Sequence, residues 1–192
     1  MDYLELSHKN TLMAQKIIDE SRIVSLWQAV GAQVNLVGSL RIGVLSKHLD
    51  IDFHIYTPAL DIAQSFAVMA QIALNHAVKK IEFVNLALTE ECCFEWHICY
   101  EDNNGQLWQI DIIQIKSGSR YDGYFERVAE TIKSKMSEDM KKTILQLKFE
   151  TPDTLKIAGI EYYKAVIQDG ITNFDDFLKW RSEHHFEGII EW

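Results

Sequence analysis

Two short polar motifs interrupt apolar runs in the first third of the chain. The first is Gly38-Ser39, which ends the apolar run Val34–Val37, and the second is Asp50-Ile51-Asp52, ten residues further on. Carboxylates two residues apart in a strand point to the same face, so their like charges are held close together. Because a divalent cation relieves this repulsion, the pair predicts a metal site.

The Gly-Ser motif supplies a second chemical part. Gly38 has no Cβ, so a ligand can approach the backbone closely, and the Ser39 hydroxyl and the N–H groups that follow can bind phosphate oxygens. A phosphate-binding turn beside a carboxylate pair suits phosphoryl or nucleotidyl transfer with Mg²⁺. A third carboxylate, Asp111, is the single charge in the apolar run Leu107–Ile115, where an ionised group needs a partner.

Together, these motifs resemble the signature of the DNA polymerase β-like nucleotidyltransferase superfamily, over about residues 8–116. The small antibiotic-modifying and minimal nucleotidyltransferases are nearest in size and layout. The resemblance implies that Asp50, Asp52 and Asp111 are both the catalytic and the metal-binding residues and hold two Mg²⁺ ions, with Mn²⁺ as an alternative. It also implies that Gly38 and Ser39 position the phosphates of an NTP such as ATP.

Two basic residues near these motifs are further candidate phosphate ligands. Arg41 follows the Gly-Ser turn closely enough to reach a phosphate, although an arginine in a loop is often a solvated charge. Lys116 directly follows the Asp111 run, beside the polar turn Ser117-Gly118-Ser119. This turn could contact a triphosphate or form an ordinary connection to the next helix. The expected nucleotide-binding residues are therefore Gly38, Ser39, Arg41 and Lys116.

The expected activity is transfer of an NMP from an NTP to a hydroxyl acceptor, with release of pyrophosphate. The acceptor is expected to be a small molecule, such as an antibiotic or a sugar, or a protein side chain. The formal net charge of −9 argues against a long nucleic acid as the acceptor. A catalytically weak nucleotide-binding or regulatory partner protein of the same fold is the alternative. A purely structural role for the three carboxylates is a third interpretation.

Composition indicates an ordinary globular protein. With 192 residues, 47% hydrophobic and 24% charged, the chain can bury a full core. No apolar run approaches the ~18–20 residues of a bilayer span, and the acidic start is not a signal peptide, so we expect a cytoplasmic protein without a membrane partner. Cys92, Cys93 and Cys99 lack Cys-x-x-Cys spacing and fit a reducing compartment. Although His97 lies among them, a structural role is favoured over a metal site.

The elements that must position these residues follow from hydrophobic spacing and turn residues. Residues 8–30 have helical spacing, with Ser7 as N-cap and Gly31 as the stop. Asn103-Asn104-Gly105 is a hairpin signal, which places Asp111 on the second arm of a hairpin. A helix is expected at 59–78, and strands are expected at 33–37, 50–56, 81–87, 93–101 and 107–115.

After Lys116 the pattern becomes helical. Apolar residues keep a period near 3.6 from Tyr124 to Leu147, Thr151-Pro152 has the form of a helix start, and Gly170 that of a helix stop. We therefore expect an α+β fold in which a nucleotidyltransferase-like mixed sheet is flanked by helices. The expected division is a catalytic domain over 1–119 and a C-terminal helical subdomain over 120–192 that closes one side of the cleft.

Overall fold

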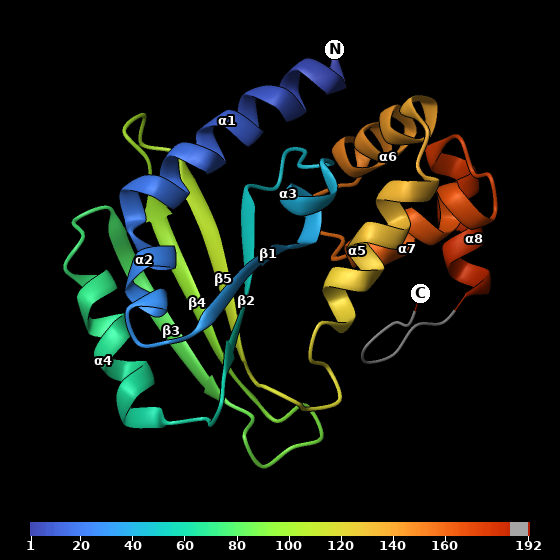
Figure 1. Cartoon of the computed structure of the whole chain (residues 1–192). Helices are drawn as coiled ribbons and strands as arrows, with labels where there is room; N and C mark the ends of the chain where they lie inside the picture. The colour runs from blue at the N-terminus through green and yellow to red at the C-terminus, as the bar shows by residue number, and fades with distance from the viewer. Residues whose placement is uncertain (185–191) are drawn as a thin grey trace.

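A mixed five-stranded sheet lies at the centre of the computed structural model, which describes residues 1–184 and 192 (Figure 1). Its strands are β1 (Gln33–Val37), β2 (Asp50–Thr57), β3 (Val78–Asn85), β4 (Cys93–Glu101) and β5 (Leu107–Lys116), in the order β1-β2-β5-β4-β3. β2 and β5 are parallel, and the other neighbouring pairs are antiparallel. The expected α+β fold with a mixed sheet is confirmed.

Three helices cover one face of the sheet: α1 (Tyr3–Ser21), α2 (Ile23–Gln28) and α4 (Ile62–Ala73). Because side chains alternate along a strand, Ile51, Phe53 and Ile55 of β2 all point into this core. Trp27 of α2 is fully buried in the same core. The residues that alternate with them in β2, including Asp50 and Asp52, therefore point to the opposite face.

The register of the sheet brings the aspartates side by side on that opposite face. Asp52 of β2 pairs with Asp111 of β5, and Asp111 pairs on its other side with His97 of β4. Val37, the residue before Gly38, pairs with Asp52 from β1. The β4–β5 hairpin that the Asn-Asn-Gly sequence predicts is confirmed.

The helices that follow β5 gather beside the β1 edge of the sheet (Figure 1). They share a second apolar core, with Ile144, Leu147 and Phe177 at its centre. Ile42 and Val44, which come shortly after the Gly-Ser turn, belong to this core too, so the helices pack on the segment that carries that turn. The helices are α5 (Tyr124–Lys135), α6 (Glu138–Glu150), α7 (Gly159–Tyr163), continued by a π-helical turn (Lys164–Gln168), and α8 (Phe174–Glu183).

The expected boundary between residues 119 and 120 falls in the turn before α5. Residues 185–191 of the expected subdomain lie outside the described residues. No helix in the described part of the chain is long and apolar enough to cross a membrane.

Several helix ends differ from the expectation. The region 8–30 contains two helices because Arg22 adopts a left-handed conformation, with φ 59°, between them. The first helix starts at Tyr3, where the Asp2 carboxylate accepts from two backbone N–H groups, so the prediction of Ser7 as N-cap is wrong. Thr151 ends α6 instead of starting a helix, and its hydroxyl donates to the Leu147 carbonyl.

Candidate active site

A cavity of about 420 Å³ opens on the sheet face that carries the aspartates. Asp50, Asp52 and Asp111 line it together with Gly38 and Ser39, so the structure brings these predicted site residues together. Helix α5 supplies an apolar part of the wall, through Phe125, Val128, Ala129 and Ile132. The cavity therefore combines clustered carboxylates with a surface that water solvates poorly.

The carboxylates strongly affect one another's ionisation. Burial raises the pKa of Asp52 to about 7, with Asp50 and Asp111 adding to the rise and Lys148 opposing it. Burial also raises the pKa of Asp50, and the charge of Asp111 adds to this rise. Mutual repulsion opposes the ionisation of all three carboxylates, and a bound cation would neutralise this negative charge. Carboxylate oxygens are also the ligands that Mg²⁺ prefers. The donor set therefore fits a divalent cation.

Gly38 is required for a steric reason that the sequence did not reveal. It opens the short helix α3 (Gly38–Ile42) with φ +65°, a conformation that favours glycine. A Cβ at this position would collide with the carboxylate of Asp52. The glycine thus lets the Gly-Ser turn come into contact with the strand that carries the carboxylates.

Lys148 of α6 is a site residue that the sequence analysis missed. It is buried, and its Nζ donates to Ser39 Oγ at 2.5 Å and to the Val44 carbonyl at 3.2 Å. Burial lowers the pKa of Lys148 to about 8, although the charges of Asp52 and Asp50 oppose this decrease. Its position one helical turn after Ile144 was a usable signal, because a lysine on the apolar face of a helix needs a polar partner.

A second cavity, of about 730 Å³, adjoins the first, and the two share Ser39, Asp50 and Gly159. Lys148 and Lys156 line this second cavity. Arg181 also lines it but is held by Glu161, with Nε 2.6 Å from Oε2. The space beside Ser39 therefore has both the room and the basic groups that a phosphate chain needs.

One oxygen of Asp111 is held by two neighbours. His97 Nδ1 lies 2.7 Å from Asp111 Oδ1, and Gln109 Nε2 donates to the same oxygen at 2.8 Å. The other ring nitrogen of His97, Nε2, is 3.6 Å from Glu95 Oε2. Burial lowers the pKa of His97, but the hydrogen bond to Asp111 and the charges of Asp111 and Glu95 outweigh burial, so the pKa is raised. The sequence analysis did not place His97 in the site.

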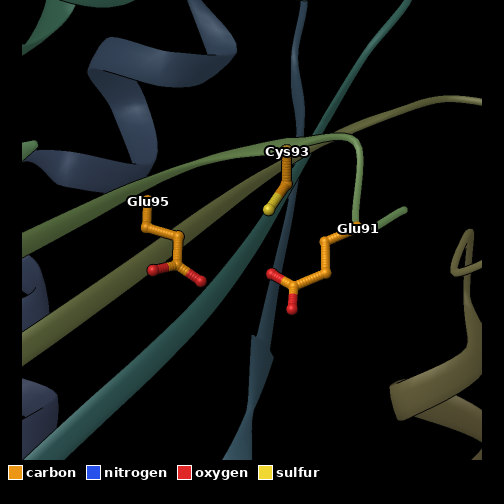
Figure 2. Close-up of side chains that lie close together, drawn as sticks. All are labelled: Glu91, Cys93 and Glu95. Atoms are coloured by element: carbon orange, nitrogen blue, oxygen red, sulfur yellow. The ribbon is translucent and has the colours of Figure 1, made fainter. Parts of the chain in front are cut away.

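A separate cluster of Glu91, Cys93 and Glu95 lies at the start of β4 (Figure 2). Their carboxylate oxygens and the thiol sulfur lie within 4.8 Å of one another. They line a third cavity, of about 380 Å³, that shares His54, Ile113 and Phe125 with the first. Burial and the charges of both glutamates raise the pKa of Cys93 to about 12. All three cysteines of the chain are free thiols.

Two of the predicted nucleotide-binding residues lie away from the aspartates. Arg41 Nη2 donates to Oε1 of Glu130 on α5 at 2.6 Å, at the protein surface. Lys116 is exposed at the end of β5, where it pairs with Thr57. Neither residue lines the cavity that contains the aspartates. The basic group that the structure puts beside the Gly-Ser turn is Lys148.

Solved structures share this arrangement of sheet and helices, whereas no family model and no curated protein matches the chain. A structure of Cid1, described for its RNA terminal uridylyl transferase activity, matches with a TM-score of 0.54 and 16% identity over 82% of this chain and 46% of that one. A cytoplasmic RNA terminal U-transferase matches with a TM-score of 0.55 and 14% identity, over 85% of this chain and 52% of that one. A structure of the noncanonical poly(A) polymerase complex GLD-2–GLD-3 matches with a TM-score of 0.57 and 10% identity, over 87% of this chain and 58% of that one.

The chain spans about half the length of these solved chains. At such low identities the likeness concerns the fold. The chain therefore has the same fold as these solved structures of a terminal uridylyl transferase and a poly(A) polymerase.

Proposed function

We propose that the protein transfers an NMP from an NTP to a hydroxyl group of an acceptor and releases pyrophosphate. The observation that carries this proposal is that Asp50, Asp52 and Asp111 line one cavity with Gly38 and Ser39. The fold supports it, because the solved proteins that share the fold are described as a uridylyl transferase and a poly(A) polymerase. Both names denote nucleotidyl transfer.

The three aspartates are the residues that would hold the divalent ions which this fold family implies. We assign Asp111 to the acceptor side and Asp50 and Asp52 to shared contacts, with two Mg²⁺ ions in the complete site and Mn²⁺ as a substitute. When bound, such ions neutralise phosphate charge and lower the pKa of the acceptor hydroxyl. The raised pKa of Asp52 supports this assignment, because a cation would replace the proton that the carboxylate retains.

Ser39 and Lys148 are our first choices as triphosphate ligands. They hydrogen-bond to each other, and Ser39 lies where the first two cavities meet. A phosphate oxygen that took the place of Ser39 Oγ would accept a charge-assisted hydrogen bond from Lys148. Arg41 would first have to leave Glu130, and Lys116 lies outside the cavity, so both rank below Lys148 as phosphate ligands.

The reaction forms one bond and breaks one. An oxygen of the acceptor attacks the α-phosphorus, the bond from this phosphorus to the bridging oxygen breaks, and pyrophosphate leaves. The acceptor hydroxyl gives up its proton to solvent. The apolar side chains that α5 turns toward the aspartates, Val128 and Ile132 among them, would exclude water that otherwise competes as an acceptor.

For the acceptor we propose a small hydroxyl compound or a protein side chain. The cavity next to the Asp111 side of the site contains Glu91 and Glu95, and the whole chain has a net charge of −9. A phosphate backbone would therefore meet negative charge on this side. Because the solved neighbours are described as acting on RNA, an RNA 3′ end is the competing acceptor and belongs in the test.

Two further proposals concern the chain as a whole. The free cysteines support a reducing compartment, and we propose the cytoplasm. We also propose a division into a catalytic domain over 1–119 and a helical subdomain over 120–192, because the helices after β5 supply most residues of the second apolar core.

The test is Mg²⁺-dependent release of pyrophosphate from each NTP, with small hydroxyl compounds, a protein and a short RNA as acceptors. We expect release with the natural protein and loss of it in Asp50→Asn. Asp139→Asn, at a carboxylate whose side chain is 97% exposed on α6, is the matched control and should retain activity. Nucleotide binding without release for any acceptor would favour the regulatory alternative, and no Mg²⁺-dependent binding would contradict both functions.

A further inference from the structure

We propose that His97 is a positioning residue that, together with Gln109, fixes the carboxylate of Asp111 so that one defined oxygen remains for a cation. This inference rests on the proposed function, because it concerns how the site prepares one of its three carboxylates. It goes beyond that function by assigning a role to a histidine on a different strand from any of the aspartates.

The first observation is the convergence of two donors on a single oxygen. His97 Nδ1 and Gln109 Nε2 approach Asp111 Oδ1 to 2.7 and 2.8 Å. In the part of the chain that the structure describes, both hydrogen bonds that Asp111 accepts through its side chain go to Oδ1. The carboxylate plane is thereby fixed, and Oδ2 is left as the oxygen that can bind a cation.

The second observation is that His97 is itself held in place. It pairs directly with Asp111 across the β4–β5 ladder, and β4 is an inner strand with β3 on its other side. Glu95, two residues earlier on the same face, has its Oε2 3.6 Å from His97 Nε2. Both ring nitrogens therefore face carboxylates, which sets the direction in which Nδ1 points.

The third observation separates Asp111 from the other two aspartates. Within the described residues, the side chains of Asp50 and Asp52 accept no hydrogen bond, so no donor orients either carboxylate. Asp111 is already oriented before any ligand binds. A carboxylate that is oriented in advance loses less conformational freedom on binding and fixes where the cation must lie.

The test is a Mn²⁺ titration of the full chain with a non-hydrolysable NTP analogue, followed by the EPR signal of free Mn²⁺. We expect His97→Leu to weaken Mn²⁺ binding by about 10- to 100-fold. His97→Asn should recover most of this loss, because the amide nitrogen of asparagine can stand near the position of Nδ1. His8→Leu, at an exposed histidine on α1, is the matched control and should bind as the natural protein does.

Gln109→Ala is the second variant, and it guards against misfolding because this side chain is exposed. It should weaken Mn²⁺ binding in the same direction as His97→Leu. In the transfer reaction both variants should lower kcat more than they raise KM for the NTP, since neither residue lines the cavity that contains Lys148 and Lys156.

The outcomes separate the two proposals. If the natural protein binds Mn²⁺ with the analogue but His97→Leu and Gln109→Ala bind it equally well, the positioning role is overturned and the proposed function stands. If the natural protein binds no Mn²⁺ with any analogue, the proposed function fails and the positioning role fails with it. A loss in His97→Leu that asparagine does not recover would assign His97 to packing and contradict the positioning role.

Discussion

Asp52 is the carboxylate whose protonation is most altered by its surroundings. Burial, together with the charges of Asp50 and Asp111, raises its pKa from 3.8 to about 7. Between these two values the folded protein retains a proton that the unfolded chain has lost, so the stability of the metal-free protein falls as the pH rises from about 4 to about 7. A divalent cation must displace this proton, so its apparent affinity should rise over the same range.

Asp52→Asn should therefore stabilise the metal-free protein while abolishing transfer. Above pH 7 asparagine removes a buried charge beside Asp50, and we expect the free energy of unfolding to rise by about 1–2 kcal/mol. Urea unfolding at pH 8 and pH 5 measures this, and the gain should shrink at pH 5, where Asp52 is protonated. Equal stability of the variant and the natural protein at pH 8 would contradict the account.

Gly38→Ala should cost more than strain in the backbone alone. A methyl group there collides with the Asp52 carboxylate, whereas at Gly31, which also has a positive φ of 81°, a Cβ meets open space. We expect Gly31→Ala to lower the free energy of unfolding by about 1 kcal/mol through φ strain, and Gly38→Ala to lower it further. Thermal unfolding of both variants measures the difference. If both variants lost the same free energy of unfolding, the Asp52 carboxylate would move aside from the added methyl group without an energetic cost.

At the scale of elements, α5 is tied to the sheet mainly through Glu126. The Tyr56 hydroxyl donates to this carboxylate, 2.9 Å from each oxygen, and Asn35 Nδ2 donates at 2.9 Å. His54 packs edge-on against Phe125 beside it, with ring centroids 5.0 Å apart. These contacts position the apolar wall of the cavity.

Tyr56→Phe should loosen this wall without touching the aspartates. Loss of the hydroxyl leaves Glu126 with one donor fewer, and we expect the free energy of unfolding to fall by about 1–2 kcal/mol. Amide hydrogen exchange in α5 should become faster, while exchange in α1 stays unchanged. Uniformly faster exchange across the chain would show that the contact has no local effect.

The sequence predicted those elements whose signal is local. The apolar runs that contain Asp52 and Asp111 predicted the two strands that carry these residues to within a residue. A hairpin centred on Asn104 places His97 opposite Asp111, so the sequence was sufficient to predict this contact as well. The sequence could not predict the break between helices α1 and α2 at Arg22. The apolar spacing continues through this residue, and no local signal marks its left-handed backbone.

The sequence could not predict the contacts that depend on tertiary packing. Lys148 approaches Ser39 only because α6 packs on the segment after the Gly-Ser turn, and their separation in sequence gives no hint of this. Conversely, Arg41 is close to Ser39 in sequence, but α3 turns it toward Glu130 on α5. Proximity along the chain therefore favoured Arg41 as a candidate, whereas the packing of the helices brings Lys148 to Ser39.

At the scale of the whole molecule, two apolar cores meet in the segment that follows the Gly-Ser turn. Leu40 and Leu45 belong to the core under the sheet, whereas Ile42 and Val44 belong to the core of the later helices. Neither core can lose its packing without disturbing this shared segment.

We therefore expect the chain to unfold in one cooperative transition. Near-UV circular dichroism and far-UV circular dichroism should give the same midpoint in urea, because Trp27 in the first core and Trp180 in the second lose their surroundings together. Two separated transitions would indicate that the helices after β5 fold as an independent unit.

The central claim, that three aspartates on neighbouring strands serve NMP transfer, is tested most directly by following the α-phosphate. An NTP labelled at this phosphorus is incubated with Mg²⁺, the acceptors named above, and the natural protein, Asp111→Asn or Asp139→Asn. We predict that the label moves to an acceptor with the natural protein and with Asp139→Asn, and that transfer falls by at least about 100-fold with Asp111→Asn. Transfer that is unchanged in Asp111→Asn, or label that reaches no acceptor, would contradict the claim.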